Sequence, residues 1–93
     1  MAQVNWTQKS LKDLRAINDY ISLDSTFYAA RFVSKLIERV DQLTEFPESG
    51  RIVPEKESSE IRELIEGNYR IFYRVKKDKV TILRIHNSAK RIN

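Results

Sequence analysis

Cysteine is absent from this sequence of 93 residues, and histidine occurs only once. The lack of cysteine excludes a disulfide scaffold and a cysteine-ligated zinc site, and a single histidine excludes a multi-histidine metal site. No apolar run approaches the ~18 residues that span a bilayer, and the N-terminal residues lack the pattern of a secretory signal peptide. We therefore expect a cytoplasmic protein with no cofactor, no metal site and no membrane segment.

The charge of the chain is small in total but unevenly distributed. Lys and Arg number 17 against 13 Asp and Glu, so the formal net charge is +4. Residues 1–68 carry a net charge of −3, whereas residues 69–93 carry +7, with Asp78 as their only acid. The length fits one domain over residues 1–93. The last quarter of that domain is therefore expected to attract an anionic partner, either a nucleic acid or an acidic protein segment.

The hydrophobic pattern predicts two helices followed by three strands. A short strand at residues 2–6 leads to Thr7, a good helix cap, and two amphipathic helices are separated by a break at residues 23–26. The second helix is expected to end near Phe46, because Pro47 cannot continue it. A surface loop over 47–60 precedes strands at 61–66, 69–75 and 80–86. The predicted class is α+β in the order β-α-α-β-β-β, with a helical hairpin on one face of a small, mainly antiparallel sheet.

Gly67 and Asn68 suit a two-residue hairpin turn, because both tolerate positive φ. This turn places Ile71, Tyr73 and Val75 toward the helices and leaves Arg70 and Arg74 exposed around Phe72 on the open face. In the last strand, Arg84 and His86 share a face opposite Leu83 and Ile85. Whether that face is the open one depends on the turn at residues 76–79, which the sequence leaves undecided.

The candidate site is a set of cationic residues on the last two strands and the tail. Guanidinium groups bind phosphate or carboxylate in pairs of hydrogen bonds, and a histidine can move a proton near neutral pH. The alternative is that strand arginines merely solubilise a sheet edge. The one-sided charge favours a functional patch, which we expect to comprise Arg70, Arg74, Arg84, His86, Lys90 and Arg91.

Two other groups are weaker candidates. Tyr20, Phe27, Tyr28 and Phe32 could form a partner-binding surface, although packing inside the helical hairpin explains most of them. An acidic cluster in the loop resembles metal ligands, but a loop of this composition is more often simply solvated. Its members are Glu55, Glu57 and Glu60.

Three segments together resemble the ParE/RelE superfamily of toxins from type II toxin–antitoxin systems. They are residues 61–75 (IRELIEGNYRIFYRV), residues 82–91 (ILRIHNSAKR) and the loop at residues 46–51 (FPESGR). The family fold has the element order predicted above. The resemblance implies a toxin that forms a hetero-oligomer with an acidic, partly disordered antitoxin.

The superfamily contains two activities. RelE-type toxins are ribosome-dependent endoribonucleases that cut mRNA, and the resemblance implies His86, Glu63 and Arg70 as catalytic candidates, with Arg84 as a second phosphate clamp. The sequence lacks the tyrosine that follows the last strand in RelE enzymes and has Ile61-Arg62-Glu63 where they place catalytic lysines. These departures favour a ParE-like inhibitor of DNA gyrase without nuclease activity. A non-toxic, basic nucleic-acid-binding module is a third interpretation.

Overall fold

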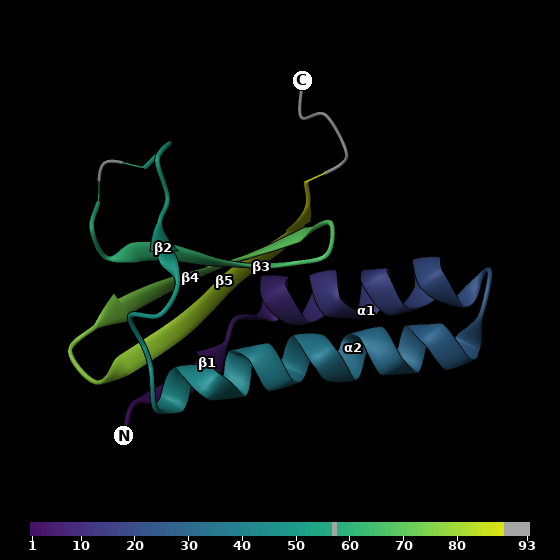
Figure 1. The fold of residues 1–93 in the computed structure, drawn as a ribbon, viewed down its shortest axis with the longest axis horizontal. Coiled ribbons are helices and arrows are strands. Elements are labelled where there is room, and N and C mark those ends of the chain that lie inside the picture. Colours follow the sequence, from purple (N-terminus) through teal and green to yellow (C-terminus); the bar gives the residue numbers. More distant parts are fainter. Residues whose placement is uncertain (57, 89–93) are drawn as a thin grey trace.

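The computed structural model describes residues 1–56 and 58–88, which form two layers (Figure 1). The predicted element order is confirmed, with one strand added at the start of the long loop. In chain order the elements are β1 (Gln3–Trp6), α1 (Gln8–Ser22), α2 (Thr26–Asp41), the 3₁₀ turn η1 (Gln42–Thr44), β2 (Arg51–Ile52), β3 (Ile61–Glu66), β4 (Tyr69–Lys76) and β5 (Lys79–Asn87).

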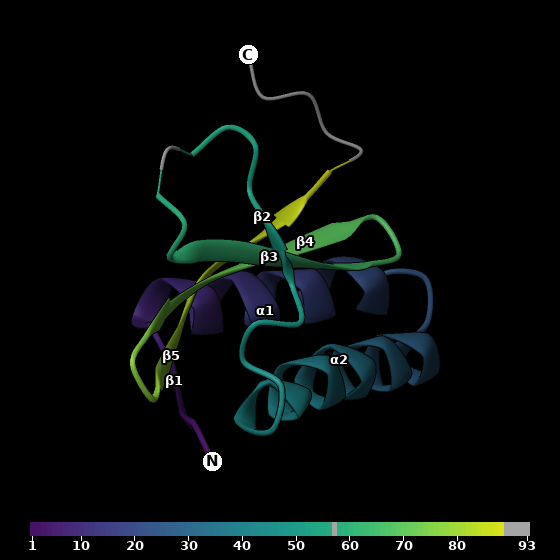
Figure 2. The ribbon, with the colours of Figure 1, turned by 60° about the vertical axis from the view of Figure 1, so that its left-hand side comes forward.

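The strands form one sheet in the order β1-β5-β4-β3-β2. β1 runs parallel to β5, and the other neighbours are antiparallel. Figures 1 and 2 show both helices on one face of the sheet, while the loop between β2 and β3 rises on the opposite side. The predicted α+β architecture is therefore confirmed, and the second face of the sheet is only partly covered.

Side chains cap both helices at their N-termini. The hydroxyl of Thr7 accepts from the Ser10 amide at 3.0 Å, and that of Ser25 accepts from the Tyr28 amide at 3.1 Å. The α-helical part of α2 ends at Asp41, earlier than the predicted end near Phe46. The Thr44 hydroxyl donates to the Asp41 carbonyl at 2.9 Å, and such a bond competes with helix continuation, so the chain tightens into η1.

The hydrophobic core lies between the helical hairpin and the sheet. Leu36 and Val40 of α2 and Ile71 and Tyr73 of β4 are fully buried there, and Trp6 packs against the same cluster. The prediction that Ile71 and Tyr73 face the helices is confirmed. The turn at Gly67-Asn68 also has the predicted register, since Glu66 pairs with Tyr69 and Leu64 with Ile71.

A β-bulge in β5 decides which side chains of that strand reach the open face. Tyr73 pairs with Ile82, but Phe72 pairs with Arg84, so Leu83 is an extra residue in the ladder. The second turn is a two-residue loop, because Lys76 pairs with Lys79. That turn alone would have turned Arg84 and His86 toward the helices, since side chains alternate along a strand.

The bulge reverses this alternation for the end of β5. Arg84 and His86 become the partners of Phe72 and Arg70, respectively. The expectation that Leu83 and Ile85 share the opposite face is half wrong. Ile85 is buried in the core. Leu83, the extra residue of the bulge, lines the same open groove as His86.

Candidate partner-binding surfaces

A groove of about 730 Å³ lies on the open face of the sheet, under the loop between β2 and β3. Apolar side chains of the strands contribute to its lining, and cationic side chains surround them. Four of the six residues of the predicted patch line this groove. Lys90 and Arg91 lie outside the described residues. The lining from the sheet includes Ile61, Arg70, Phe72, Arg74, Leu83, Arg84 and His86.

Arg70 is partly buried and paired, contrary to the expectation of an exposed side chain. Its Nε donates to Glu63, and its Nη2 donates to Glu55 Oε2 at 3.1 Å. The guanidinium lies 4.8 Å from the centre of the Phe72 ring, within the range of a cation–π contact. Arg70 is partly buried because its partner Glu63, on the same face of the sheet, is itself buried.

Glu63 is the only acidic residue among the buried side chains of the described chain. Its two carboxylate oxygens accept from Arg51 of β2 and Arg70 of β4. Burial by itself raises the pKa of Glu63, but the hydrogen bonds and charges of Arg70 and Arg51 outweigh it, and the pKa is lowered from 4.5. Glu63 therefore stays ionised at neutral pH and acts as an internal counter-ion.

The loop that leads into β2 is anchored beside this ion-pair cluster. The Gly50 amide donates to the Tyr73 hydroxyl at 2.8 Å, and Arg62 Nη1 donates to the Gly50 carbonyl at 2.8 Å. A Cβ at Gly50 would lie 2.5 Å from both the Glu63 carbonyl oxygen and the Tyr73 hydroxyl. The position therefore requires glycine, because backbone and a buried ring approach it so closely.

Arg84 lies at the edge of the sheet and is joined to α1. Its Nε and Nη2 donate to the two oxygens of Asp13 at 2.8 and 3.2 Å. Asp13 also accepts a hydrogen bond from the Ile85 amide at 2.9 Å. It thereby satisfies a backbone N–H of β5 beyond the end of β1. Burial raises the pKa of Asp13, but the bonds from Arg84 and Ile85 lower it further, below 3.8 overall. Arg84 is thus a structural clamp as well as a groove residue.

Arg74 and His86 remain the available members of the predicted patch. Arg74 is exposed and makes no ion pair with any residue that the structure describes. His86 is half-buried opposite Arg70, and its ring meets the Phe72 ring edge-on at 5.5 Å. Within the described part of the chain, the groove therefore presents one free guanidinium and one imidazole beside the ring of Phe72.

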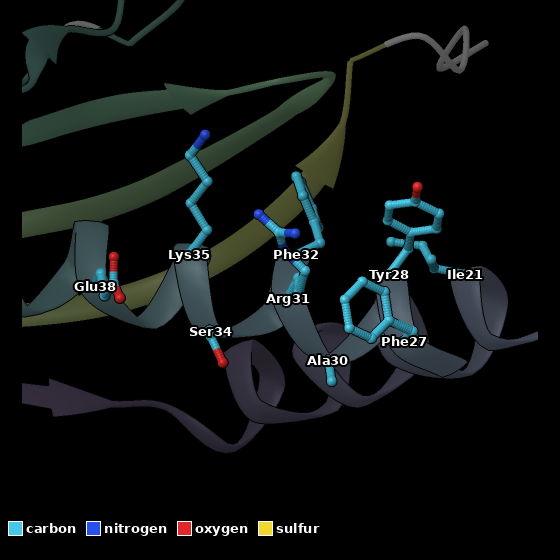
Figure 3. A pocket seen from close by; sticks show the side chains of 9 residues that line it. All are labelled: Ile21, Phe27, Tyr28, Ala30, Arg31, Phe32, Ser34, Lys35 and Glu38. Carbon is cyan, nitrogen blue, oxygen red and sulfur yellow. The ribbon is translucent and has the colours of Figure 1, made fainter. Parts of the chain in front are cut away.

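A second surface, a weaker candidate in the sequence analysis, lies on α2 (Figure 3). Phe27 and Tyr28 are 62% and 63% exposed, and Tyr20 of α1 is 60% exposed. The expectation that packing inside the hairpin explains most of the four aromatic residues is wrong, because of these four only Phe32 is partly buried, against Tyr69 at 5.4 Å. Phe27 and Tyr28 fall outside the buried stripe that begins at Ala29, and this spacing was the available signal.

The acidic residues of the loop are separated by their contacts. Glu55 pairs with Arg70, Glu60 is exposed, and Glu57 lies outside the described residues. Within residues 1–56 and 58–88, no group of histidines and carboxylates is arranged to hold a metal ion. Over the same ranges, none of the helices has the length and apolar character needed to cross a membrane.

A helical hairpin on a small sheet with a basic open groove defines a two-layer α+β domain with a candidate binding face. The chain belongs to the ParE toxin family of type II toxin–antitoxin systems, and its match to this family covers residues 4–92. It is 41% identical over 91 residues to Toxin RelE2 of Caulobacter vibrioides, covering 97% of this chain and 99% of that protein.

Solved structures share this fold. The chromosomal ParDE toxin–antitoxin system from P. aeruginosa is similar with a TM-score of 0.77 and 32% identity, covering 94% of this chain and 96% of that chain. The toxin–antitoxin complex RelBE2 from Mycobacterium tuberculosis shares the fold, with a TM-score of 0.69 and 21% identity over 92% of this chain and 96% of that one. The protein is therefore a toxin of a type II system in the ParE/RelE superfamily.

Proposed function

We propose that this toxin inhibits DNA gyrase by binding it in the cytoplasm, that it has no nuclease activity, and that a cognate acidic antitoxin neutralises it in a hetero-oligomeric complex. The observation that carries the proposal is the position of Glu63. An acid–base pair for RNA cleavage needs a group that can exchange a proton near neutral pH. Glu63 is buried, ionised and bound at both oxygens by arginines.

The remaining nuclease candidates are also engaged in the fold. Arg70 is paired with Glu63 and Glu55, and Arg84 is paired with Asp13, so neither guanidinium has its full set of donors for a scissile phosphate. His86 would have to act alone. A RelE-type endoribonuclease is kept as the second candidate because the name of the Caulobacter relative favours it.

The open groove is the proposed contact surface for the target. Arg74 and His86 supply polar contacts, and Phe72 and Leu83 supply apolar area between them. Aromatic and arginine side chains are the residue types that most often dominate protein interfaces. Lys90 and Arg91 would extend this surface, as proposed from the sequence.

The aromatic face of α2 is the proposed docking surface for the antitoxin. Phe27 and Tyr28 expose large apolar area, and Arg31 lies 5.7 Å from the centre of the Phe27 ring. An amphipathic helix with apolar anchors and acidic flanks would cover the rings and pair with Arg31. An antitoxin that folds on this face would satisfy both features at once.

Two assays on the purified toxin, released from its antitoxin, test the proposed target. We expect inhibition of supercoiling by gyrase and no cleavage of mRNA in translating ribosomes. Arg74→Ala should weaken gyrase inhibition, whereas Arg15→Ala on the exposed side of α1 serves as a control of equal charge and should not. Ribosome-dependent cleavage that disappears in His86→Ala would instead establish the nuclease, and an inactive toxin in both assays would reject both candidates.

The antitoxin surface is tested separately by co-purification. Phe27→Ala/Tyr28→Ala should reduce retention of the toxin on tagged antitoxin, and Arg74→Ala should leave it unchanged. Retention that follows Arg74 but not the aromatic pair would place the antitoxin on the groove instead.

A further inference from the structure

The free positive charge of the described sheet runs along β4 from Arg74, at the border of the groove, to the β4–β5 turn. Arg74, Lys76, Lys77 and Lys79 are all exposed and form no ion pair within the described ranges 1–56 and 58–88. The only acid among them is Asp78, in the turn itself. By contrast, Arg51, Arg70 and Arg84 each have a carboxylate partner. We call Arg74, Lys76, Lys77 and Lys79 the basic strip.

Strand pairing places most of the strip on the open face. Lys76 pairs directly with Lys79, and Arg74 pairs with Thr81. The neighbouring Val75 and Val80 pack on the helix side. Because side chains alternate along a strand, Arg74, Lys76, Lys79 and Thr81 point away from the core. Gln3 and Asn5 continue the same face onto β1, opposite Lys79 and Thr81.

The pairing of Lys76 with Lys79 is unfavourable by itself. Side chains directly opposite each other in an antiparallel pair have Cβ atoms only ~5 Å apart, and like charges there are destabilising. Neither lysine forms an ion pair with a described carboxylate. An anionic ligand would relieve the repulsion between them, and this is the feature that distinguishes the strip from a scattered set of solvated lysines.

The composition of the strip points to phosphate rather than to protein. The neutral residues beside the strip, Gln3, Asn5 and Thr81, carry amide and hydroxyl donors, which commonly bind phosphate and sugar oxygens. At the turn itself, residues 76–79 include no aromatic or large apolar side chain, while Arg74, at the other end of the strip, borders the groove that contains Phe72. Protein interfaces are enriched in such anchors, and single-stranded nucleic acids are bound by aromatic stacking platforms. A duplex backbone requires neither.

We propose that the basic strip binds the phosphate backbone of duplex DNA without sequence specificity. This contact goes beyond the proposed action on gyrase and can be measured in its absence. It would hold the toxin on DNA, and its affinity should depend steeply on salt because binding releases condensed counter-ions.

The experiment measures binding of the free, full-length toxin to a fluorescent duplex of ~20 base pairs by anisotropy, between about 50 and 200 mM salt. The test variant is Arg74→Gln/Lys76→Gln/Lys79→Gln. The matched control is Lys9→Gln/Lys12→Gln/Arg15→Gln, which removes the same charge from the exposed side of α1. All substituted residues are exposed, and a thermal melt verifies that each variant is folded. Lys76→Gln alone serves if the triple variant does not fold.

We expect the strip variant to lose roughly tenfold or more in affinity at low salt, and the slope of log K against log salt to fall by about 3 in magnitude. The control should retain most of both. Equal losses in the two variants would overturn the proposal in favour of general charge attraction. Tighter binding to single-stranded RNA or to polyglutamate, lost in the same variant, would assign the strip to those partners instead. Unchanged DNA binding in the strip variant would also overturn it, whatever the gyrase assay shows.

Discussion

Replacement of Glu63 by glutamine tests whether the buried ion-pair cluster holds the loop on the sheet. The substitution keeps the size of the side chain but removes the charge that Arg51 and Arg70 share. The Glu63 side chain is 0% exposed, against 23% for Arg70 and 59% for Arg51. Breaking a fully buried pair costs about 3–5 kcal/mol. Water screens Arg51 after the change, so we expect a smaller loss, about 2–3 kcal/mol.

Thermal unfolding followed by circular dichroism measures this loss. For a domain of this size, each 1 kcal/mol shifts the Tm by about 4–8 °C, so Glu63→Gln should melt roughly 10–20 °C below the wild type at neutral pH. Glu60→Gln is the matched control. It makes the same charge change at an exposed residue just before β3 and should stay within about 0.5 kcal/mol of the wild type.

The pH dependence of stability gives an independent check. The pKa of Glu63 is lowered in the folded protein from its ordinary value of 4.5, so the unfolded chain binds a proton more readily. The stabilisation by Glu63 is therefore complete above about pH 4.5 and is lost as the pH falls through the folded pKa. The difference in Tm between Glu63→Gln and the wild type should shrink over that range. A variant that melts with the wild type at neutral pH would refute the structural role of Glu63.

Three further variants probe the surroundings of the site by denaturant unfolding. Gly50→Ala forces a Cβ to 2.5 Å from the Tyr73 hydroxyl and should cost about 1–3 kcal/mol; wild-type stability would contradict the close approach. Tyr73→Phe leaves the buried Gly50 amide without its acceptor and should cost about 1–3 kcal/mol. Asp13→Asn removes the clamp on Arg84, and because the pKa of Asp13 is lowered from 3.8, its destabilisation should disappear as the pH falls below that value. A pH-independent difference would show that the Asp13 charge contributes nothing.

The positive charge of the last quarter has two roles in the structure. Arg70 and Arg84, together with Arg51 of β2, form ion pairs that join β2, β3 and β4 to one another and β5 to α1. Arg74 and the lysines at the β4–β5 turn make no such pairs in the described residues. Net charge along the sequence therefore overestimates the charge that a partner can use, because buried or edge carboxylates neutralise part of it.

Local signals in the sequence were sufficient for the element order and for one half of the sheet. Thr7 caps α1 as predicted, and the Gly67-Asn68 turn sets the pairing of β3 with β4. That register placed Ile71 and Tyr73 toward the helices and put Arg70 and Arg74 on one shared face. These features depend on residues close together in the chain, so composition and period determine them.

Tertiary contacts decided the features that govern the site. The bulge at Leu83 turns Arg84 and His86 to the open face, and it exists because Ile82 and Ile85 both pack into the core three residues apart. A strict alternation cannot bury both of them. The pairing of Glu63 with Arg51 depends on the loop folding back to form β2, which no local pattern indicated.

The same distinction applies to charge and exposure. The sequence by itself determined that the protein is basic at its C-terminal end and has the ParE/RelE element order. Only the tertiary structure decided which cations are paired, because Asp13 and Glu55 come from segments far from the arginines they bind. It also left Phe27 and Tyr28 exposed, since the core already fills the other side of α2.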